Sequence, residues 1–400
     1  MSLSRTVFRT LPLATAVALA FASGAQAQSL VEMYEAARGY DAGFISAKAQ
    51  FEANLAKANQ TLGGILPNIA LSASAARTYS DVRYDNPAQQ PNPFVNPRLY
   101  GTGSAAVTLS QPIYRPAAWA AYRQGGYLLQ QAAAQYEAAE QDLLVRVSQA
   151  YFDVLTSEDS LTLVQTQKQA VGEQLASAKR NFEVGTATIT GVRDAQARFD
   201  LASAQEIAGE NDLRIKRLAL DLAVGLSNAK PKRLANNTQL VETPKEDVNA
   251  WVSISATNSP AVRQAQLGLD IASQEVNKAT AGHKPTIDAQ VSYAGVRNDG
   301  GNSVSGTSTH VLAPSAAIVL NMPIFAGFST MYKVKEAVAL EDKARSDYEN
   351  ARRATAQATR TAYFGLVAGL SQVKAYEAAE ASSQSALDAN KLGYSVGVNI

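Results

Sequence analysis

Few side chains of this sequence have the type and spacing that metal or nucleophile chemistry requires. The two histidines, His283 and His310, lack the spacing of zinc ligands, and the chain contains no cysteine. No Gly-x-Ser-x-Gly turn is present to expose a nucleophilic serine. A loose dinucleotide-binding pattern, GTGSAA at 101–106, falls inside a predicted strand, whereas phosphate binding needs it between a strand and a helix. The sequence therefore argues against an enzyme and predicts no metal and no cofactor.

The charge of the chain argues against a nucleic-acid partner. Lysine and arginine total 36 and aspartate and glutamate total 35, which leaves a formal net charge of +1. Proteins that bind nucleic acid usually carry a basic field, and no DNA-reading motif is present. The function must therefore be sought in the helices and strands that the chain forms.

The first residues have the pattern of an export signal. Two arginines precede an apolar run from Leu11 to Ala22, and the small-x-small site AQA follows at 25–27. The run is too short to cross hydrocarbon comfortably, so a cleaved signal peptide is favoured over a membrane anchor. Cleavage is expected between Ala27 and Gln28, with residues 1–27 removed. Without cysteine, the exported chain has no disulfide and no site for a lipid anchor at its new N-terminus.

Four segments alternate between apolar and small or polar residues with a period of two. The first is LPNIALSASA at 66–75, in which Ile69 and Leu71 share one face. The other three run from Tyr100 to Pro112, from Thr286 to Val296 and from Val311 to Met322. Each has about the 9 to 11 residues that a tilted strand needs to cross a bilayer. They predict two membrane β-hairpins, within residues 66–113 and 284–325.

Long segments with helical periodicity flank these strands. We expect one helix of about 50 Å from Ser29 to Leu62 and one of about 100 Å from Ala117 to Val184. After the turn FEVGTATITGV at 182–192, helix resumes from Arg193 to about Gly225. The second half is expected to be helical from about Asp247 to Ala281 and again from about Thr330. Helices of this length need partners alongside, because no globular core is so long.

Matching landmarks indicate that the second half repeats the first. Pro67 corresponds to Pro285 at an offset of 218 residues, Pro112 corresponds to Pro323 at an offset of 211, and in the long helices Tyr151 corresponds to Tyr363 at an offset of 212. The shorter offset after the strand loop places the length difference in that loop, where insertions are tolerated. The predicted organisation is therefore a first repeat at 28–227, a linker at 228–249 and a second, incomplete repeat at 250–400. The second repeat stops before a counterpart of the helix after Arg193, so we expect the chain to be truncated by one long helix.

Four strands are too few to close a barrel. An open sheet edge in hydrocarbon leaves backbone N–H and C=O groups unpaired, at several kcal/mol each. Other subunits must complete the wall: two chains give eight strands and three give twelve, and the larger barrel leaves room for a passage. The alternatives are ordinary strands of a soluble α+β domain and a soluble periplasmic coiled-coil adaptor or structural protein, whose helices mediate contacts without conducting anything.

The order and spacing of these motifs resemble the TolC-type outer-membrane channels of Gram-negative bacteria, within the outer membrane efflux protein family. The resemblance covers almost the whole mature chain and is closer to the type I secretion branch than to the lipoprotein branch. The motifs that carry it are SLVEMYEAAR, ILPNIALSAS, SQPIYRPAAW, SQAYFDVLTSEDSL, FEVGTATITGVRDAQARFDLASAQ, GHKPTIDAQVSYAG, NMPIFAGF and LDANKLGYSVG.

The resemblance implies a mainly α fold with membrane β-hairpins. In a TolC-like homotrimer, four strands per subunit form a twelve-stranded barrel in outer-membrane lipid, and very long helices continue it as a periplasmic α-barrel. The resemblance also implies a passive export channel for efflux or type I secretion. Its partners would be a periplasmic adaptor (membrane fusion) protein and an inner-membrane transporter, with proteins and small toxic compounds as alternative cargoes.

The resemblance further implies that two helix-turn-helix tips, at 182–194 and 392–400, close the periplasmic entrance. Gly191 stands where a related channel has an aspartate, with Asp194 as a substitute, and Asn399 stands in place of an arginine. We therefore expect neutral hydrogen bonds in the latch. The gate residues implied are Gly185, Gly191, Arg193, Asp194, Tyr394, Gly397 and Asn399.

Overall fold

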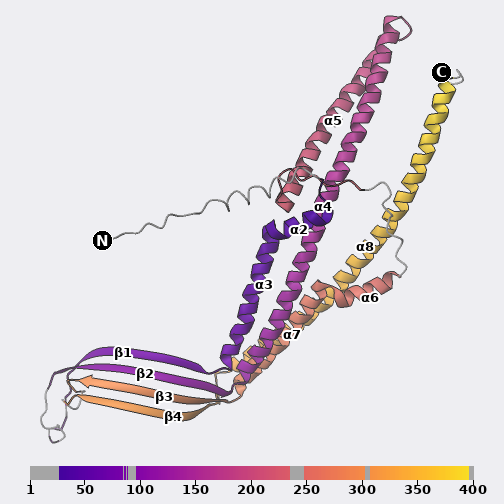
Figure 1. Cartoon of the computed structure of the whole chain (residues 1–400). Coiled ribbons are helices and arrows are strands. Elements are labelled where there is room, and N and C mark those ends of the chain that lie inside the picture. The colour runs from indigo at the N-terminus through magenta and orange to yellow at the C-terminus, as the bar shows by residue number, and fades with distance from the viewer. Residues whose placement is uncertain are drawn as a thin grey trace, which may run out of the picture. The chain divides into compact units, whose positions relative to one another are not determined.

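The structure is a computed structural model that describes residues 27–83, 85–86, 88, 96–234, 247–301 and 307–395 (Figure 1). Within the predicted signal peptide, only Ala27 belongs to this part of the chain. The chain divides into two compact units, which are considered separately. Unit 1 comprises Met1–Lys48 and Glu137–Glu242, and unit 2 comprises Ala49–Tyr136 and Thr243–Ile400. The repeat boundaries at 28–227 and 250–400 remain a prediction.

Unit 2 contains one antiparallel sheet in the strand order β1-β2-β3-β4. All four predicted strands are confirmed. Their bounds are β1 Asn68–Ser80, β2 Arg98–Tyr114, β3 Thr286–Asp299 and β4 Thr309–Asn321. The first strand continues beyond the predicted end at Ala75, because Thr78 and Tyr79 still pair with Tyr100 and Leu99.

The two hairpins share one register. When β1 is shifted by the landmark offset of 218 residues and β2 by 211, the pair Asn68 and Ser110 becomes Thr286 and Asn321, and both pairs are present. Two serine hydroxyl pairs, each 2.8 Å apart, are related by the same shifts: Ser74 with Ser104, and Ser292 with Ser315. The duplication of the sequence therefore extends to the pairing of individual strand residues.

The predicted single helix from Ser29 to Leu62 is wrong, because the chain breaks at Asp41. Helix α2 (Leu30–Tyr40) ends there and α3 (Ala42–Gln60) begins, with Asp41 in an extended conformation. Its backbone N–H still donates to the carbonyl oxygen of Ala37, while its carboxylate accepts the N–H of Phe44 at 2.7 Å. One residue thus closes the first helix and caps the second.

The predicted single helix from Asp247 to Ala281 is also wrong. Helix α6 (Val248–Asn258) ends before α7 (Pro260–Thr280), and Ser259 between them is extended, with φ −64° and ψ 126°. A proline restricts the residue before it to this region, and its fixed φ suits the first position of a helix. The break was therefore readable from Ser259-Pro260.

The remaining long helices follow the prediction closely. Helix α4 spans Pro116–Glu183 and α8 spans Ser329–Ser395. Helix α5 (Ile189–Val224) begins four residues before Arg193, because the Thr188 hydroxyl caps it by accepting the N–H of Gly191. Among the residues that the structure describes, no helix carries an apolar stretch of the length that a membrane crossing requires.

In unit 1, three helices enclose an apolar core. Its fully buried side chains come from α2, α4 and α5: Met33, Leu143, Val147, Val154, Leu220 and Val224. Tyr151 of α4 donates its hydroxyl to the carbonyl oxygen of Lys232, and the backbone of Gln28 bridges Lys230 and Lys232. The segment after α5 therefore closes one side of this core.

Candidate functional site

The four-stranded sheet of unit 2 has one apolar face. Residues that pair across neighbouring strands lie on the same side of a sheet, so the pairing fixes the membership of each face. This face carries large side chains that are exposed to its surroundings: Ile69, Leu71, Val107, Leu109, Val291, Tyr293, Ile318 and Leu320. Such a surface is typical of contact with lipid hydrocarbon.

The opposite face carries mainly small and polar side chains, with Val311 and Val319 of β4 as exposed apolar exceptions. Hydroxyl and amide groups hydrogen-bond across the strands, with Thr102 donating to Asn298 at 3.0 Å and Asn298 donating to Thr309 at 3.1 Å. The serine pairs of both hairpins lie on this face. Alternation of this kind is expected of a strand with lipid on one side and an aqueous lumen on the other.

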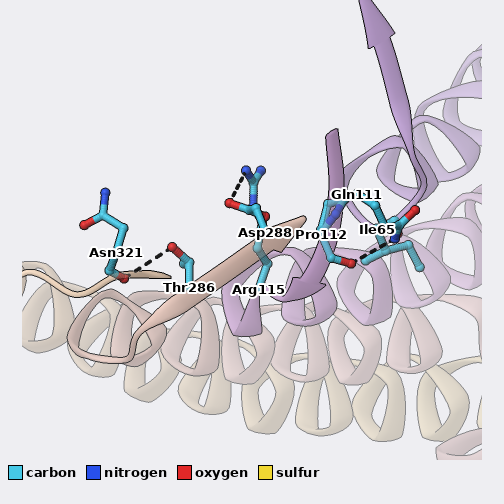
Figure 2. A network of polar contacts seen from close by, with 7 residues as sticks. All are labelled: Ile65, Gln111, Pro112, Arg115, Thr286, Asp288 and Asn321. Carbon is cyan, nitrogen blue, oxygen red and sulfur yellow. Dashed lines mark hydrogen bonds and ion pairs between the residues drawn. The ribbon is translucent and has the colours of Figure 1, made fainter. Parts of the chain in front are cut away.

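A polar network fastens the two hairpins together where the strands meet the helices (Figure 2). Arg115 follows β2 and makes a bidentate ion pair with Asp288 of β3, at 2.7 Å from Nε to Oδ1 and 2.9 Å from Nη2 to Oδ2. The Asp288 side chain is only 11% exposed. Gln111 donates to the carbonyl oxygens of Ile65 and Pro112 beside it. This junction joins the end of the first hairpin to the start of the second.

Sequence reasoning missed the Arg115–Asp288 pair, although a signal for it existed. The duplicated sequence places Ala326 at the position of Arg115 and Ala70 at the position of Asp288. Arg115 and Asp288 therefore each occur in one repeat only. If β2 is paired with β3, these two opposite charges come close together, which predicts an ion pair at a junction that occurs once in each chain.

The turn between α4 and α5 in unit 1 is built by local hydrogen bonds. Gly185 has φ +80°, its N–H donates to the carbonyl oxygen of Phe182, and the N–H of Thr186 donates to that of Asn181. This is the glycine-terminated helix end expected from the sequence. Gly191, Arg193 and Asp194 are exposed just beyond it.

Of the predicted gate residues, the structure brings Gly185, Gly191, Arg193 and Asp194 together in this one turn. Asp194 forms an ion pair with Arg198 at 3.0 Å, one turn along the same helix, and both side chains are 65% exposed. Tyr394 lies in the last turn of α8, whereas Gly397 and Asn399 lie outside the described residues. The predicted cleavage residue Gln28 lies in a parallel bridge with Pro231.

Charged pairs hold the helices of unit 1. Arg146 of α4 contacts Asp41 at 3.0 Å, and this hydrogen bond keeps the pKa of the Asp41 carboxyl below its ordinary value. Lys216 of α5 contacts Asp153 of α4 at 2.9 Å and lowers the pKa of Asp153 in the same way. Both carboxylates are therefore stabilised in their ionised form by partners on a neighbouring helix.

Comparison with known proteins gives the same assignment as this geometry. The sequence model of the family described as "Outer membrane efflux protein" matches residues 33–226 and 251–399. The chain belongs to this family. It is 31% identical to outer membrane protein TolC of Vibrio cholerae, over 97% of this chain and 86% of that protein. It is 26% identical to the alkaline protease secretion protein AprF of Pseudomonas aeruginosa, over 94% of this chain and 77% of that protein.

The fold of this efflux-family chain is also that of solved channels. The structure of the CmeC outer membrane channel of Campylobacter jejuni matches with a TM-score of 0.74 at 18% identity, over 93% of this chain and 77% of that one. The predicted mainly α fold with two membrane hairpins is confirmed. The protein is an outer-membrane efflux or secretion channel that extends into the periplasm, in a family of channels rather than enzymes.

Proposed function

We propose that three copies of the chain form a passive export duct across the outer membrane. The observation that carries this proposal is one sheet with an apolar face, a polar face and two outer strands. Within the described part of the chain, β1 and β4 each pair with one strand only. A sheet of this kind in lipid needs other subunits to pair its edges, and twelve strands leave room for a lumen. The helices would continue the duct through the periplasm.

In this proposal the duct works with a periplasmic adaptor protein and an inner-membrane transporter. The chain belongs to a family described as outer membrane efflux proteins, and one relative is a secretion protein for an alkaline protease, which supports both efflux and type I secretion as roles. The duct itself performs no chemistry, so the transporter must supply the energy.

We further propose that the turns at 182–194 and 392–400 form the gate of the periplasmic entrance. The Asp194 carboxylate is already engaged by Arg198 within its own helix. A latch through Asp194 would have to compete with that pair, whereas Tyr394, Gly397 and Asn399 offer neutral groups. Disruption of this latch should therefore widen the entrance without unfolding the wall.

Single-channel conductance in planar bilayers tests the duct and its gate. The unmodified protein should insert and conduct weakly, and Tyr394→Ala should conduct more, because a latch contact is lost. Tyr376→Ala is the matched control, since Tyr376 is an exposed tyrosine of the same helix, 68% exposed and outside the predicted tip. A protein that neither inserts nor conducts would rule out the duct. Equal conductance of the two variants would rule out Tyr394 as a gate residue.

A further inference from the structure

The strand pairing within one chain predicts how two copies meet. The β2–β3 junction joins the first hairpin to the second, and the β4–β1 junction between copies would join the second hairpin to the first of the next copy. The offsets that relate the two hairpins also convert one junction into the other: β2 becomes β4 when 211 is added, and β3 becomes β1 when 218 is subtracted. In the junction that is present, Leu109 pairs with Val291. The corresponding residues are Leu320 in β4 and Ala73 in β1.

We propose that β4 of one copy pairs antiparallel with β1 of a second copy in the register that places Leu320 opposite Ala73 and Ile318 opposite Ala75. This inference rests on the proposed trimer and specifies its seam. The register agrees with an independent property of the sheet, because Leu320 and Ala73 both belong to the apolar face. A slip by one residue would place Leu320 opposite Ser72 or Ser74 and would mix the two faces.

Exposure at the base of the outer strands supports the same register. In the junction within the chain, Tyr114 pairs with Ile287 after the irregularity at Pro112, and Ile287 is half-buried. The corresponding residues are Phe325 and Ile69, which are 74% and 72% exposed in the single chain. The proposed seam places these two large apolar side chains opposite each other and covers part of each, whereas at the junction within the chain Ile287 is half-buried and Tyr114 stays 42% exposed.

The seam differs from the junction within the chain in its charge. Arg115 and Asp288 fasten the junction within the chain, whereas the corresponding positions at the seam hold Ala326 and Ala70. The seam therefore depends on backbone pairing and on apolar contacts such as that of Ile69 with Phe325.

Disulfide cross-linking tests this register, since the chain contains no cysteine of its own. The double variant Ala73→Cys with Leu320→Cys should give a covalent trimer on a non-reducing gel after mild oxidation in native outer membranes. Residues opposite each other across antiparallel strands lie about 4.5–5.5 Å apart, within the range that a disulfide spans. Leu109→Cys with Val291→Cys is the matched positive control, because it places the same two positions at the junction within one chain.

The displaced double variant Ile69→Cys with Leu320→Cys is the negative control, since four residues along a strand separate the thiols by about 13 Å. A covalent trimer from the displaced pair alone would overturn the register while keeping the seam. Absence of cross-links from both pairs, with the positive control oxidised and the unmodified protein trimeric, would overturn the seam. An unmodified protein that is monomeric in the membrane would instead refute the proposed function.

Discussion

Corresponding helices of the two repeats are packed to different degrees. In unit 1, Met33 of α2 and Val147, Tyr151 and Val154 of α4 lie in a closed core. In unit 2, the corresponding residues of α6 and α8 line an open groove of about 380 Å³. These groove residues are Trp251, Thr359, Tyr363 and Leu366. The same helix pair is thus covered in one repeat and open in the other.

The difference shows that a pair of helices alone cannot bury all of its apolar side chains. In unit 1 the third helix, α5, contributes Leu220 and Val224, both fully buried, and Lys216 pairs with Asp153. In unit 2 the position of Asp153 is taken by Gly365, and an added Cβ there meets nothing within 4 Å. Two helices bury a single seam, and a third is needed to bury the apolar face that remains.

The largest expected effect comes from truncating the closed core. Met33→Ala removes a fully buried side chain and should lower the free energy of unfolding by about 2–5 kcal/mol, because a cavity is left. The matched variant Trp251→Ala should cost about 1 kcal/mol, since Trp251 is already 40% exposed in the groove. Thermal unfolding monitored by circular dichroism in detergent measures both. Equal losses would show that the groove is as well packed as the core.

Gly225 marks the end of α5 and should tolerate no side chain. Its φ is +76°, and an added Cβ would lie 2.2 Å from a ring carbon of Tyr40. Gly225→Ala should destabilise unit 1 by about 2 kcal/mol, from the left-handed backbone and from displacement of that ring. Hydrogen exchange should report faster opening of α5 and α2. Protection unchanged in both helices would contradict the packing of α5 that distinguishes unit 1.

Acid should weaken unit 1 through Asp41. The folded-state pKa of Asp41 lies below its ordinary value, because Arg146 hydrogen-bonds to the carboxylate. The contribution to stability is therefore complete above the unfolded pKa of about 3.9 and is lost as the pH falls through the folded pKa. Asp41→Asn should cost about 1–2 kcal/mol at pH 7 and should flatten the dependence of the unfolding midpoint on pH below about 4. An unchanged slope would remove Asp41 from this role.

Much of this architecture was predictable from the sequence because its signals are local and repeated. The alternation of apolar and polar residues located all four strands. The offset between Pro67 and Pro285 also relates the paired residues of β1 to those of β3. The breaks at Asp41 and Ser259 were missed, because helical periodicity on both sides outweighed a single residue. The Arg115–Asp288 pair was missed for a different reason. Its partners lie far apart in the chain and meet only when the two hairpins join.

The smallest expected effect is a gain at Gly365, on the open side of the comparison. Gly365 is an exposed glycine in the interior of α8, and the space around it is empty. Gly365→Ala should raise the free energy of unfolding by about 0.5–1 kcal/mol, because glycine loses more backbone entropy than alanine when it enters a helix. The midpoint of thermal unfolding should rise accordingly, in contrast with the loss at Gly225. A decrease would mean that another chain or helix approaches α8 closely at this point, so that in the assembled protein the groove of unit 2 is covered as the core of unit 1 is.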